Sequence, residues 1–363
     1  MKPHKPDYVF LIISALIVIF GLVMLSSASM VKSQETFGTP YYYLKHQLLF
    51  GLLPGLLLAY FAYKIKYQTW KKFSFLFFII AVILLIIVFI PGLSFKSGGA
   101  ARWLYLGPIT VQPSEIVKLG FILYLAAWLD QKSKNFDSAS QTLIPFLVAT
   151  GIIMGLIIIQ PNIGTAGVIG LVSLVMYFFA GAPLWHISSL LAIGFSGLFF
   201  FIKFFSHASS RFETFLHPEN EPLNAGYQMK QAILAIGSGG LLGKGLGQSI
   251  QKFNYLPESI GDSIFAIIAE ELGFIGILLI IGLFVYFAIR GLKIAQGAPD
   301  NFGKFLAVGI TSWLSLQAFI NISAISGLIP LTGVPLPLIS YGASGLVVSL
   351  VGIGILLNIS KHC

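Results

Sequence analysis

The chain has 363 residues, of which 56% are hydrophobic and 10% are charged, and its mean hydropathy is +0.89. Soluble domains usually carry about 25% charged residues, so water is excluded as the main solvent of this chain. The net charge is +9, but the basic residues are scattered between apolar runs rather than gathered in a patch, which argues against a nucleic-acid partner and favours membrane lipids. The single cysteine, Cys363, excludes a disulfide framework and a cysteine-based metal site.

Apolar runs long enough to cross a hydrocarbon core of about 30 Å recur along the whole chain. Each run must satisfy its own backbone hydrogen bonds in lipid, and the alternating pattern of a membrane β-barrel is absent, so helices are expected. The sequence therefore predicts an all-α polytopic membrane protein. Its ten predicted transmembrane helices lie near residues 8–30, 44–63, 73–90, 113–130, 141–160, 163–181, 184–205, 262–290, 303–327 and 338–358.

The distribution of basic residues predicts the orientation of these spans. The short loops on one side carry twelve Lys and Arg residues, and those on the other side carry four, which places both termini in the cytoplasm. Residues 206–261 then form one long extracytoplasmic loop between spans 7 and 8, within a single membrane domain of residues 1–363. Its apolar stretch 229–236 suits an interfacial helix or a re-entrant element. Long loops in compact domains usually carry function or are disordered.

Asp262 lies where this loop ends, shortly after Glu258 and before the apolar run 263–269. One interpretation is a helix cap, because a carboxylate is favourable at the positive end of a helix dipole. The alternative is a general base at the membrane surface, with a pKa raised by partial desolvation. Glu270 and Glu271, two to three turns deeper, are expected to be network residues.

Glu115 and Lys118 are charged residues inside a predicted span, where insertion of each costs about 2.5–3.5 kcal/mol at a helix centre. They follow Pro113 and are spaced three residues apart, so they can share one helix face. They are interpreted either as a mutually neutralising structural pair or as a lysine presented to an anionic ligand at the mouth of the bundle.

Two glycine- and proline-rich stretches interrupt the apolar pattern. Residues 237–245 are rich in glycine and include Lys244, but they lack the Walker pattern, so an ATP site is rejected. This stretch is either a flexible turn or a backbone cradle in which Lys244 contacts pyrophosphate. The proline cluster 327–337, followed by Ser340, is either a kink or the wall of a substrate groove.

At these residues the chain resembles the SEDS family (shape, elongation, division and sporulation), the membrane proteins of bacterial cell-wall synthesis that include FtsW, RodA and SpoVE. The resemblance covers essentially the whole chain, and residues 251–273 are most similar to the division branch. Its strongest segments are residues 99–104, 112–118, 226–228, 235–240, 245–249, 251–258 and 265–273.

The resemblance implies a peptidoglycan glycosyltransferase that polymerises lipid II, an undecaprenyl-pyrophosphate-linked disaccharide pentapeptide. Asp262 matches the family's essential aspartate and would be the base. Candidates for neutralising the pyrophosphate are Arg102, Lys118 and Lys244, because fixed cations that stabilise a leaving group usually supply a large electrostatic effect. The remaining candidate substrate-binding residues are Glu115, Glu258 and Ser340.

The resemblance also implies a location in the bacterial cytoplasmic membrane and a role in septal cell-wall synthesis. The partners it implies are lipid II, the undecaprenyl-pyrophosphate-linked glycan, a cognate class B penicillin-binding protein and other divisome proteins. No cofactor is evident from the residues, although the family allows a divalent cation, Mg²⁺ or Mn²⁺.

Three positions depart from the usual family pattern: Asn162 replaces an aspartate after Gln-Pro, Gly261 replaces a common threonine, and Ala343 with Gly345 loosens a Ser-Tyr-Gly-Gly-Ser-Ser motif. Two other functions compete with the enzyme, a lipid II flippase and a non-catalytic scaffold for a transpeptidase. A flippase needs charged groups along a path through the bilayer, whereas polymerisation needs an outward-facing base beside the loop. The position of Asp262 favours the enzyme.

Overall fold

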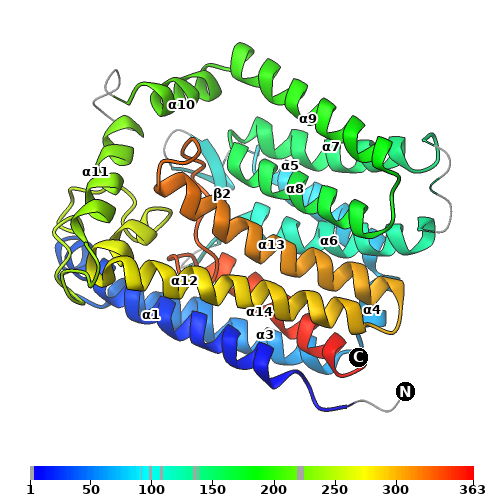
Figure 1. The fold of residues 1–363 in the computed structure, drawn as a ribbon, viewed down its shortest axis with the longest axis horizontal. Coiled ribbons are helices and arrows are strands. Elements are labelled where there is room, and N and C mark those ends of the chain that lie inside the picture. The colour runs from blue at the N-terminus through cyan, green and yellow to red at the C-terminus, as the bar shows by residue number, and fades with distance from the viewer. Residues whose placement is uncertain are drawn as a thin grey trace.

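The computed structural model describes residues 4–90, 92–97, 100–106, 109–133, 136, 139–218 and 225–363, and helices dominate them (Figure 1). Each predicted span is occupied by helix. The helices are α1 (Tyr8–Phe37), a continuous segment of α2 (Tyr42–His46), π-helix η1 (Gln47–Leu52) and α3 (Leu53–Lys64), then α5 (Ser74–Ile87), α6 (Pro113–Lys132), α7 (Leu143–Ile159), α8 (Ile163–Phe179), α9 (Leu184–Phe204), α12 (Ile264–Gly297), α13 (Asn301–Ile325) and α14 (Ala343–Ser360). Shorter helices between them are α4 (Tyr67–Lys72), α10 (Ser206–Leu216) and α11 (Ala225–Ser238).

Many of these helices suit a membrane. Among the described residues, six segments are long and apolar enough to cross one: α1, the segment from α2 to α3, α9, α12, α13 and α14. Helices α5, α7 and α8 are apolar but shorter, and the 20-residue α6 carries Glu115 and Lys118. The protein is thus an all-α polytopic membrane protein. That ten helices cross the membrane stays a prediction.

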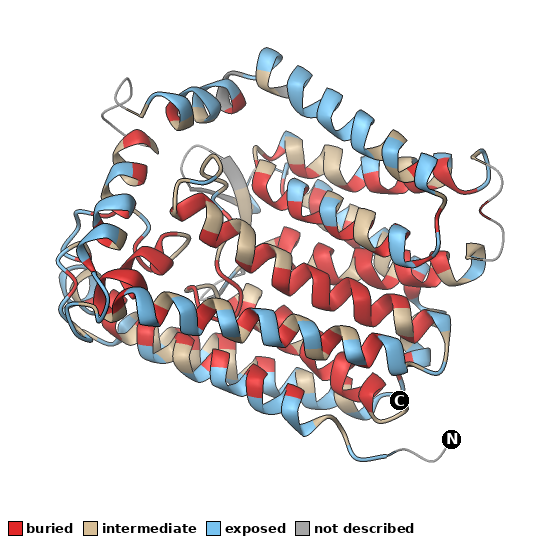
Figure 2. Ribbon diagram, in the orientation of Figure 1, coloured by how far each residue is buried: buried red, intermediate tan, exposed pale blue. Residues whose placement is uncertain are grey.

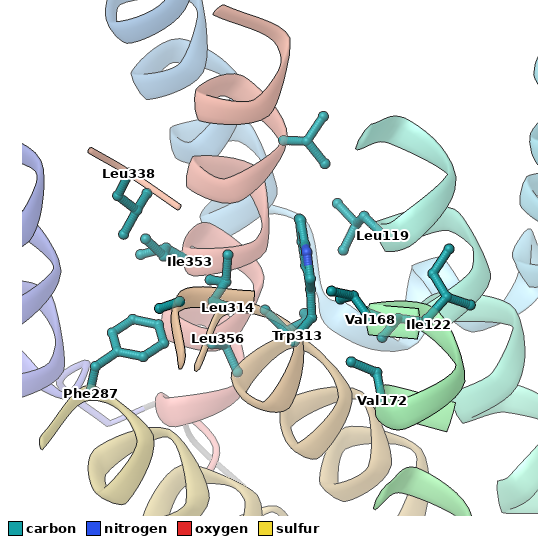
Figure 3. Close-up of a cluster of buried hydrophobic side chains, with 14 of the residues drawn as sticks. Leu119, Ile122, Val168, Val172, Phe287, Trp313, Leu314, Leu338, Ile353 and Leu356 are labelled. Atoms are coloured by element: carbon teal, nitrogen blue, oxygen red, sulfur yellow. The ribbon is translucent and has the colours of Figure 1, made fainter. Parts of the chain in front are cut away.

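Helices α13 and α9 mark the centre and the periphery of the bundle. In an 18-residue apolar stretch of α13, 83% of the residues are buried. In the corresponding stretch of α9 none is buried, although α9 is strongly apolar (Figure 2). Trp313 of α13 is fully buried, and it lies among side chains of α6 and α8 such as Ile122 and Val172 (Figure 3). An apolar helix with an unburied surface fits contact with lipid rather than with water.

Helix α12 is interrupted at Gly273, where φ is 65° and ψ is −162°. The glycine-rich stretch fills the break: Gly240 O accepts a hydrogen bond from Phe274 N at 2.9 Å, and Leu241 O accepts one from Ile275 N at 3.2 Å. A side-chain carbon at Gly273 would lie 2.3 Å from Gly243 N, so the two segments approach too closely for any larger residue. A broken membrane helix requires such replacement partners for its backbone.

The two ends of the bundle are built from different segments of the chain. The termini meet at one end, where His4 N donates to Lys361 O at 2.7 Å and Asp7 N donates to Ser360 Oγ at 3.1 Å (Figure 1). Helices α10 and α11 lie at the opposite end, with a small antiparallel sheet in the order β1 (Ser94–Ser97), β2 (Ala100–Leu106) and β3 (Ile109–Val111). The composition did not indicate this sheet, which lies between α5 and α6.

Candidate active site

Asp262 lies in the turn that leads into α12, at the end of the bundle away from the termini. Helix α12 begins at Ile264 with Ser263 as its N-cap residue, and Ser263 makes no side-chain cap bond among the described residues. Asp262 is therefore not a helix cap. Its half-buried carboxylate instead accepts a hydrogen bond at Oδ1 from Gln228 Nε2 of α11, at 3.3 Å.

The surroundings of Asp262 tune its protonation. Burial, followed by the negative charge of Glu258, raises the pKa of Asp262 to about 6, while the Gln228 hydrogen bond and the positive charge of Arg211 oppose the rise. At neutral pH the carboxylate is mostly ionised, yet it is a stronger base than an exposed aspartate. That combination suits a group that takes a proton from a hydroxyl.

Arg211 of α10 is a site residue that the sequence analysis missed. Its Nη1 donates to Leu331 O at 3.1 Å and to Thr332 O at 3.2 Å, in the connection between α13 and α14. A side-chain carbon at Gly333 would lie 3.8 Å from Asp262 Oδ2 and 3.9 Å from Arg211 Nη2, so both side chains border the same space. The available signal was that Arg211 is the sole arginine of the long loop 206–261.

Arg102 of β2 joins this group of charges. Its Nε donates to Gln160 O at 3.1 Å, and its Nη2 donates to Pro161 O, at the start of α8. Burial lowers the pKa of Arg102, and repulsion from Arg211 lowers it further, which places the two guanidinium groups within electrostatic reach of each other. In the hydrogen bonds described here both guanidinium groups donate to backbone carbonyls, which carry no net charge, so these bonds do not neutralise the arginines.

Glu258 and Ser340 both support the turn that carries Asp262. The carbonyl of Glu258 accepts hydrogen bonds from Gly261 N at 2.9 Å and Ser263 N at 3.2 Å. Ser340 is buried, and its Oγ donates to Gly261 O at 2.7 Å while accepting from Leu336 N at 2.9 Å. The structure therefore shows Ser340 bonded to backbone groups of the site. The proline-rich connection that precedes it passes beside Asp262.

Glu115 and Lys118 form a buried ion pair inside the bundle. Lys118 Nζ lies 2.8 Å from Glu115 Oε1 and 2.6 Å from Gln317 Oε1, and 5.2 Å from the centre of the Trp313 ring. Both charged residues are at most 3% exposed. This geometry matches the neutralising structural pair, because the lysine faces protein groups rather than the mouth of the bundle.

Lys244 is likewise engaged by a carboxylate. Its Nζ lies 2.6 Å from Glu270 Oε1, and its backbone N–H donates to Glu270 O at 3.0 Å. Gly245 N donates to Glu271 O at 3.0 Å, so these N–H groups of the glycine-rich stretch bind α12 and are not free to cradle a phosphate. Lys252 pairs with Glu271 at 3.1 Å. The two glutamates are network residues, as expected.

The structure gives the local surroundings of Asn162, Gly261 and Gly345, and it offers no explanation for Ala343. The Asn162 side chain accepts a hydrogen bond from Thr165 N at 3.4 Å and caps α8. A side-chain carbon at Gly261 would lie 3.1 Å from Glu258 Oε2, and one at Gly345 would lie 3.3 Å from Glu115 Oε2.

Among the described residues, no cluster of three or more His, Cys, Asp or Glu side chains could hold a metal ion.

Comparisons with known proteins define the class. The family model of the cell cycle proteins FtsW, RodA and SpoVE matches residues 7–363, and the chain belongs to this family. It is 42% identical to stage V sporulation protein E of Bacillus subtilis, over 99% of this chain and 98% of that protein. It is 39% identical to a probable peptidoglycan glycosyltransferase FtsW of Trichlorobacter lovleyi, over 98% of this chain and 93% of that protein.

Solved structures confirm the fold. A chain from a study of polymerisation and crosslinking by a peptidoglycan synthase complex superposes with a TM-score of 0.81 at 26% identity, covering 98% of both chains. The rod shape determining protein RodA of Thermus thermophilus superposes with a TM-score of 0.71 at 26% identity, covering 98% of this chain and 97% of that one. The similarity extends over the whole bundle, including the end that carries Asp262.

Proposed function

We propose that this protein is a peptidoglycan glycosyltransferase that polymerises lipid II into glycan strands for septal cell-wall synthesis during division. The observation that carries the proposal is the Asp262 carboxylate, with its raised pKa, which borders the same space as Arg211. Arg102 lies within electrostatic reach of Arg211. The names of the FtsW relatives support the activity. Asp262 faces outward if both termini are cytoplasmic, as the basic loops predict.

In the proposed reaction, Asp262 accepts the proton of the 4-hydroxyl of one GlcNAc as that oxygen attacks C1 of MurNAc on the lipid-linked strand. The new glycosidic bond forms as the bond from C1 to the pyrophosphate oxygen breaks, and undecaprenyl pyrophosphate leaves as an anion. Arg211 and Arg102 would stabilise the negative charge on that leaving group. The steps described here use only side chains of this protein. Binding of Mg²⁺ or Mn²⁺, held partly by the substrate phosphates, is a further proposal.

The proposed partner is a class B penicillin-binding protein, which would crosslink the strands, together with other divisome proteins. The superposition on a chain from a peptidoglycan synthase complex supports a crosslinking partner. The proposed location is the bacterial cytoplasmic membrane. In this proposal the base and the partner's transpeptidase domain would lie on the same outer face of the membrane.

The deciding experiment supplies labelled lipid II to the purified complex of this chain with its penicillin-binding protein. We expect glycan strands from wild type and none from Asp262→Ala, with both complexes intact. Strands made equally by Asp262→Ala would refute the assignment of the base. No strands from an intact wild-type complex would favour the scaffold, and transfer of lipid II across vesicles without strands would favour the flippase.

A further inference from the structure

The backbone that carries Asp262 is held from one side by a row of donors. Three consecutive carbonyls each accept one hydrogen bond from α13 or from the connection between α13 and α14. The bonds are Tyr341 N to Ile260 O at 2.9 Å, Ser340 Oγ to Gly261 O at 2.7 Å, and Asn321 Nδ2 to Asp262 O at 2.7 Å. A peptide held at three successive carbonyls has little freedom to rotate, so these donors fix the backbone from which the Asp262 side chain extends.

Asn321 differs from the other two donors because it holds two segments at once. Its Nδ2 also donates to Val334 O at 2.7 Å, which uses both N–H groups of the amide. Val334 follows directly on Gly333, and Leu331 and Thr332 of the same connection supply the carbonyls that bind Arg211. One side chain therefore joins the segment that carries Asp262 to the segment that holds Arg211.

The position of Asn321 is itself well defined. The residue is 1% exposed, and it lies one turn after Gln317, whose Nε2 donates to Pro335 O at 2.9 Å. Gln317 Oε1 in turn accepts from Lys118 Nζ and from Trp313 Nε1. The side chains at 317 and 321 thus hold adjacent residues of the proline-rich connection against the buried face of α13.

No other side chain of similar size reproduces this arrangement. An alanine at 321 would leave two buried carbonyls without their donor, and an aspartate would turn acceptors toward acceptors. A serine could donate to only one of the two carbonyls. The requirement is for two N–H groups on one short, planar side chain.

We propose that Asn321 is a positioning residue for the glycosyl transfer: by binding Asp262 O and Val334 O together, it sets the orientation of the Asp262 carboxylate relative to Arg211. The inference rests on the proposed function, and Asn321 would act through Asp262, because it binds the backbone carbonyl of that residue rather than its carboxylate. It requires that loss of the amide slows the chemical step while leaving lipid II binding largely intact.

A matched control exists in Asn358 of α14. Its buried amide donates to Tyr63 O at 2.7 Å and accepts from Tyr67 N at 2.9 Å, at the end of the bundle where the termini meet. Asn321→Ala and Asn358→Ala therefore remove the same side chain from comparably buried backbone contacts. A purely structural role predicts the same effect for both variants.

The test measures kcat and KM for labelled lipid II, together with thermal unfolding, in the full complex with the penicillin-binding protein. We expect Asn321→Ala to lower kcat by about 10- to 100-fold with KM within about twofold of wild type, because small displacements of a reacting group carry penalties of that size. We expect Asn321→Ala and Asn358→Ala to lower the unfolding temperature by similar amounts. Asn358→Ala should nevertheless keep the wild-type kcat.

Wild-type kcat in Asn321→Ala would overturn the positioning role, as would an equal loss of kcat in both variants. If Asn321→Ala does not accumulate, Asn321→Ser carries the same comparison, and wild-type kcat in that variant overturns the inference. Asp262→Ala, assayed alongside, separates the two proposals. Strands made equally by Asp262→Ala refute the assignment of the base, and no strands from the intact wild-type complex refute the proposed function. Inactivity of Asp262→Ala with full kcat in Asn321→Ala refutes only the positioning role.

Discussion

Arg211 and Asp262 both lie near Gly333, and a side-chain carbon at Gly333 would be 3.9 Å from Nη2 of Arg211 and 3.8 Å from Oδ2 of Asp262. The two side chains come from α10 and from the turn before α12, and α11 lies between those elements in the chain. Their positive and negative groups therefore face one space, and no direct ion pair between them is found in the part of the chain that the structure describes. An anionic substrate group could be bound by the arginine there while the carboxylate accepts a proton.

Arg211→Ala tests this relationship. We expect kcat/KM for lipid II to fall by about 10- to 100-fold, because a fixed cation beside a developing pyrophosphate contributes strongly to transition-state stabilisation. Initial rates of strand formation measure the effect. The matched control is Arg290→Ala, which removes an ion pair with Asp7 at 2.5 Å near the termini and should leave kcat/KM unchanged. Equal losses in both variants would contradict the role of Arg211.

The activity should depend on pH through Asp262. Its pKa is raised to about 6 by burial and by Glu258, and a base acts only when ionised, so kcat/KM should fall as the pH drops through about 6. Glu258→Gln removes a negative neighbour, which lowers the pKa of Asp262 and moves the acid limb to lower pH. Rates measured between about pH 4.5 and 8 reveal the shift.

The control for the pH profile is Glu213→Gln, which removes the same charge from the exposed surface of α10. We expect its acid limb to coincide with that of wild type. An acid limb that does not move in Glu258→Gln, or that moves equally in both variants, would show that Glu258 does not set the pKa of Asp262.

The buried pair Glu115–Lys118 separates a structural role from pyrophosphate binding. Lys118→Met leaves Glu115 as an uncompensated buried charge, which should destabilise the protein by about 3–5 kcal/mol, whereas the double variant Glu115→Gln with Lys118→Met removes both charges and should recover most folded protein. We expect the double variant to polymerise lipid II. Thermal unfolding and strand formation measure the two effects. A folded but inactive double variant would instead assign Lys118 to the substrate.

A surface pair provides the control for that experiment. Lys71 pairs with Asp130 at partly exposed positions, with side-chain exposures of 39% and 18%. Exposed pairs contribute about 0–1 kcal/mol, so Lys71→Met should change stability little. A large loss of stability in Lys71→Met would show that loss of any charge, rather than burial of the pair, causes the effect.

Some residues of the candidate site can be predicted from sequence motifs, and others cannot. The motifs indicate Asp262, Glu258 and Ser340, and the structure brings these three together around one turn. Arg102, also indicated by its motif, lies within electrostatic reach of Arg211. Lys118 was also chosen, but it faces Glu115 and Gln317, because a charge inside a span is stabilised by the nearest buried partners. Spacing along one helix shows which face a residue shares, not what packs against that face.

The same limit explains the glycine-rich stretch and Lys244. Its glycines predicted a turn or a cradle, and both interpretations need backbone N–H groups. Only the docking of residues 240–245 against the break at Gly273 shows that some of those N–H groups bind α12. The carbonyls that accept hydrogen bonds from these N–H groups belong to a segment about 30 residues further along the chain. A local sequence pattern therefore cannot identify them.

Membrane solvent, helical class and the approximate limits of the helices follow from the amino-acid sequence, because hydropathy accumulates over adjacent residues and a lipid-embedded backbone must bond within its own segment. The neighbours of Asp262 do not follow from it. Arg211, Gln228 and Asn321 come from three different helices, and their approach to Asp262 depends on how those helices pack. Gln228 and Arg211 act on its carboxylate, and Asn321 binds its backbone carbonyl. Tertiary packing alone therefore set the partners and the pKa of this carboxylate, since both depend on distances through space.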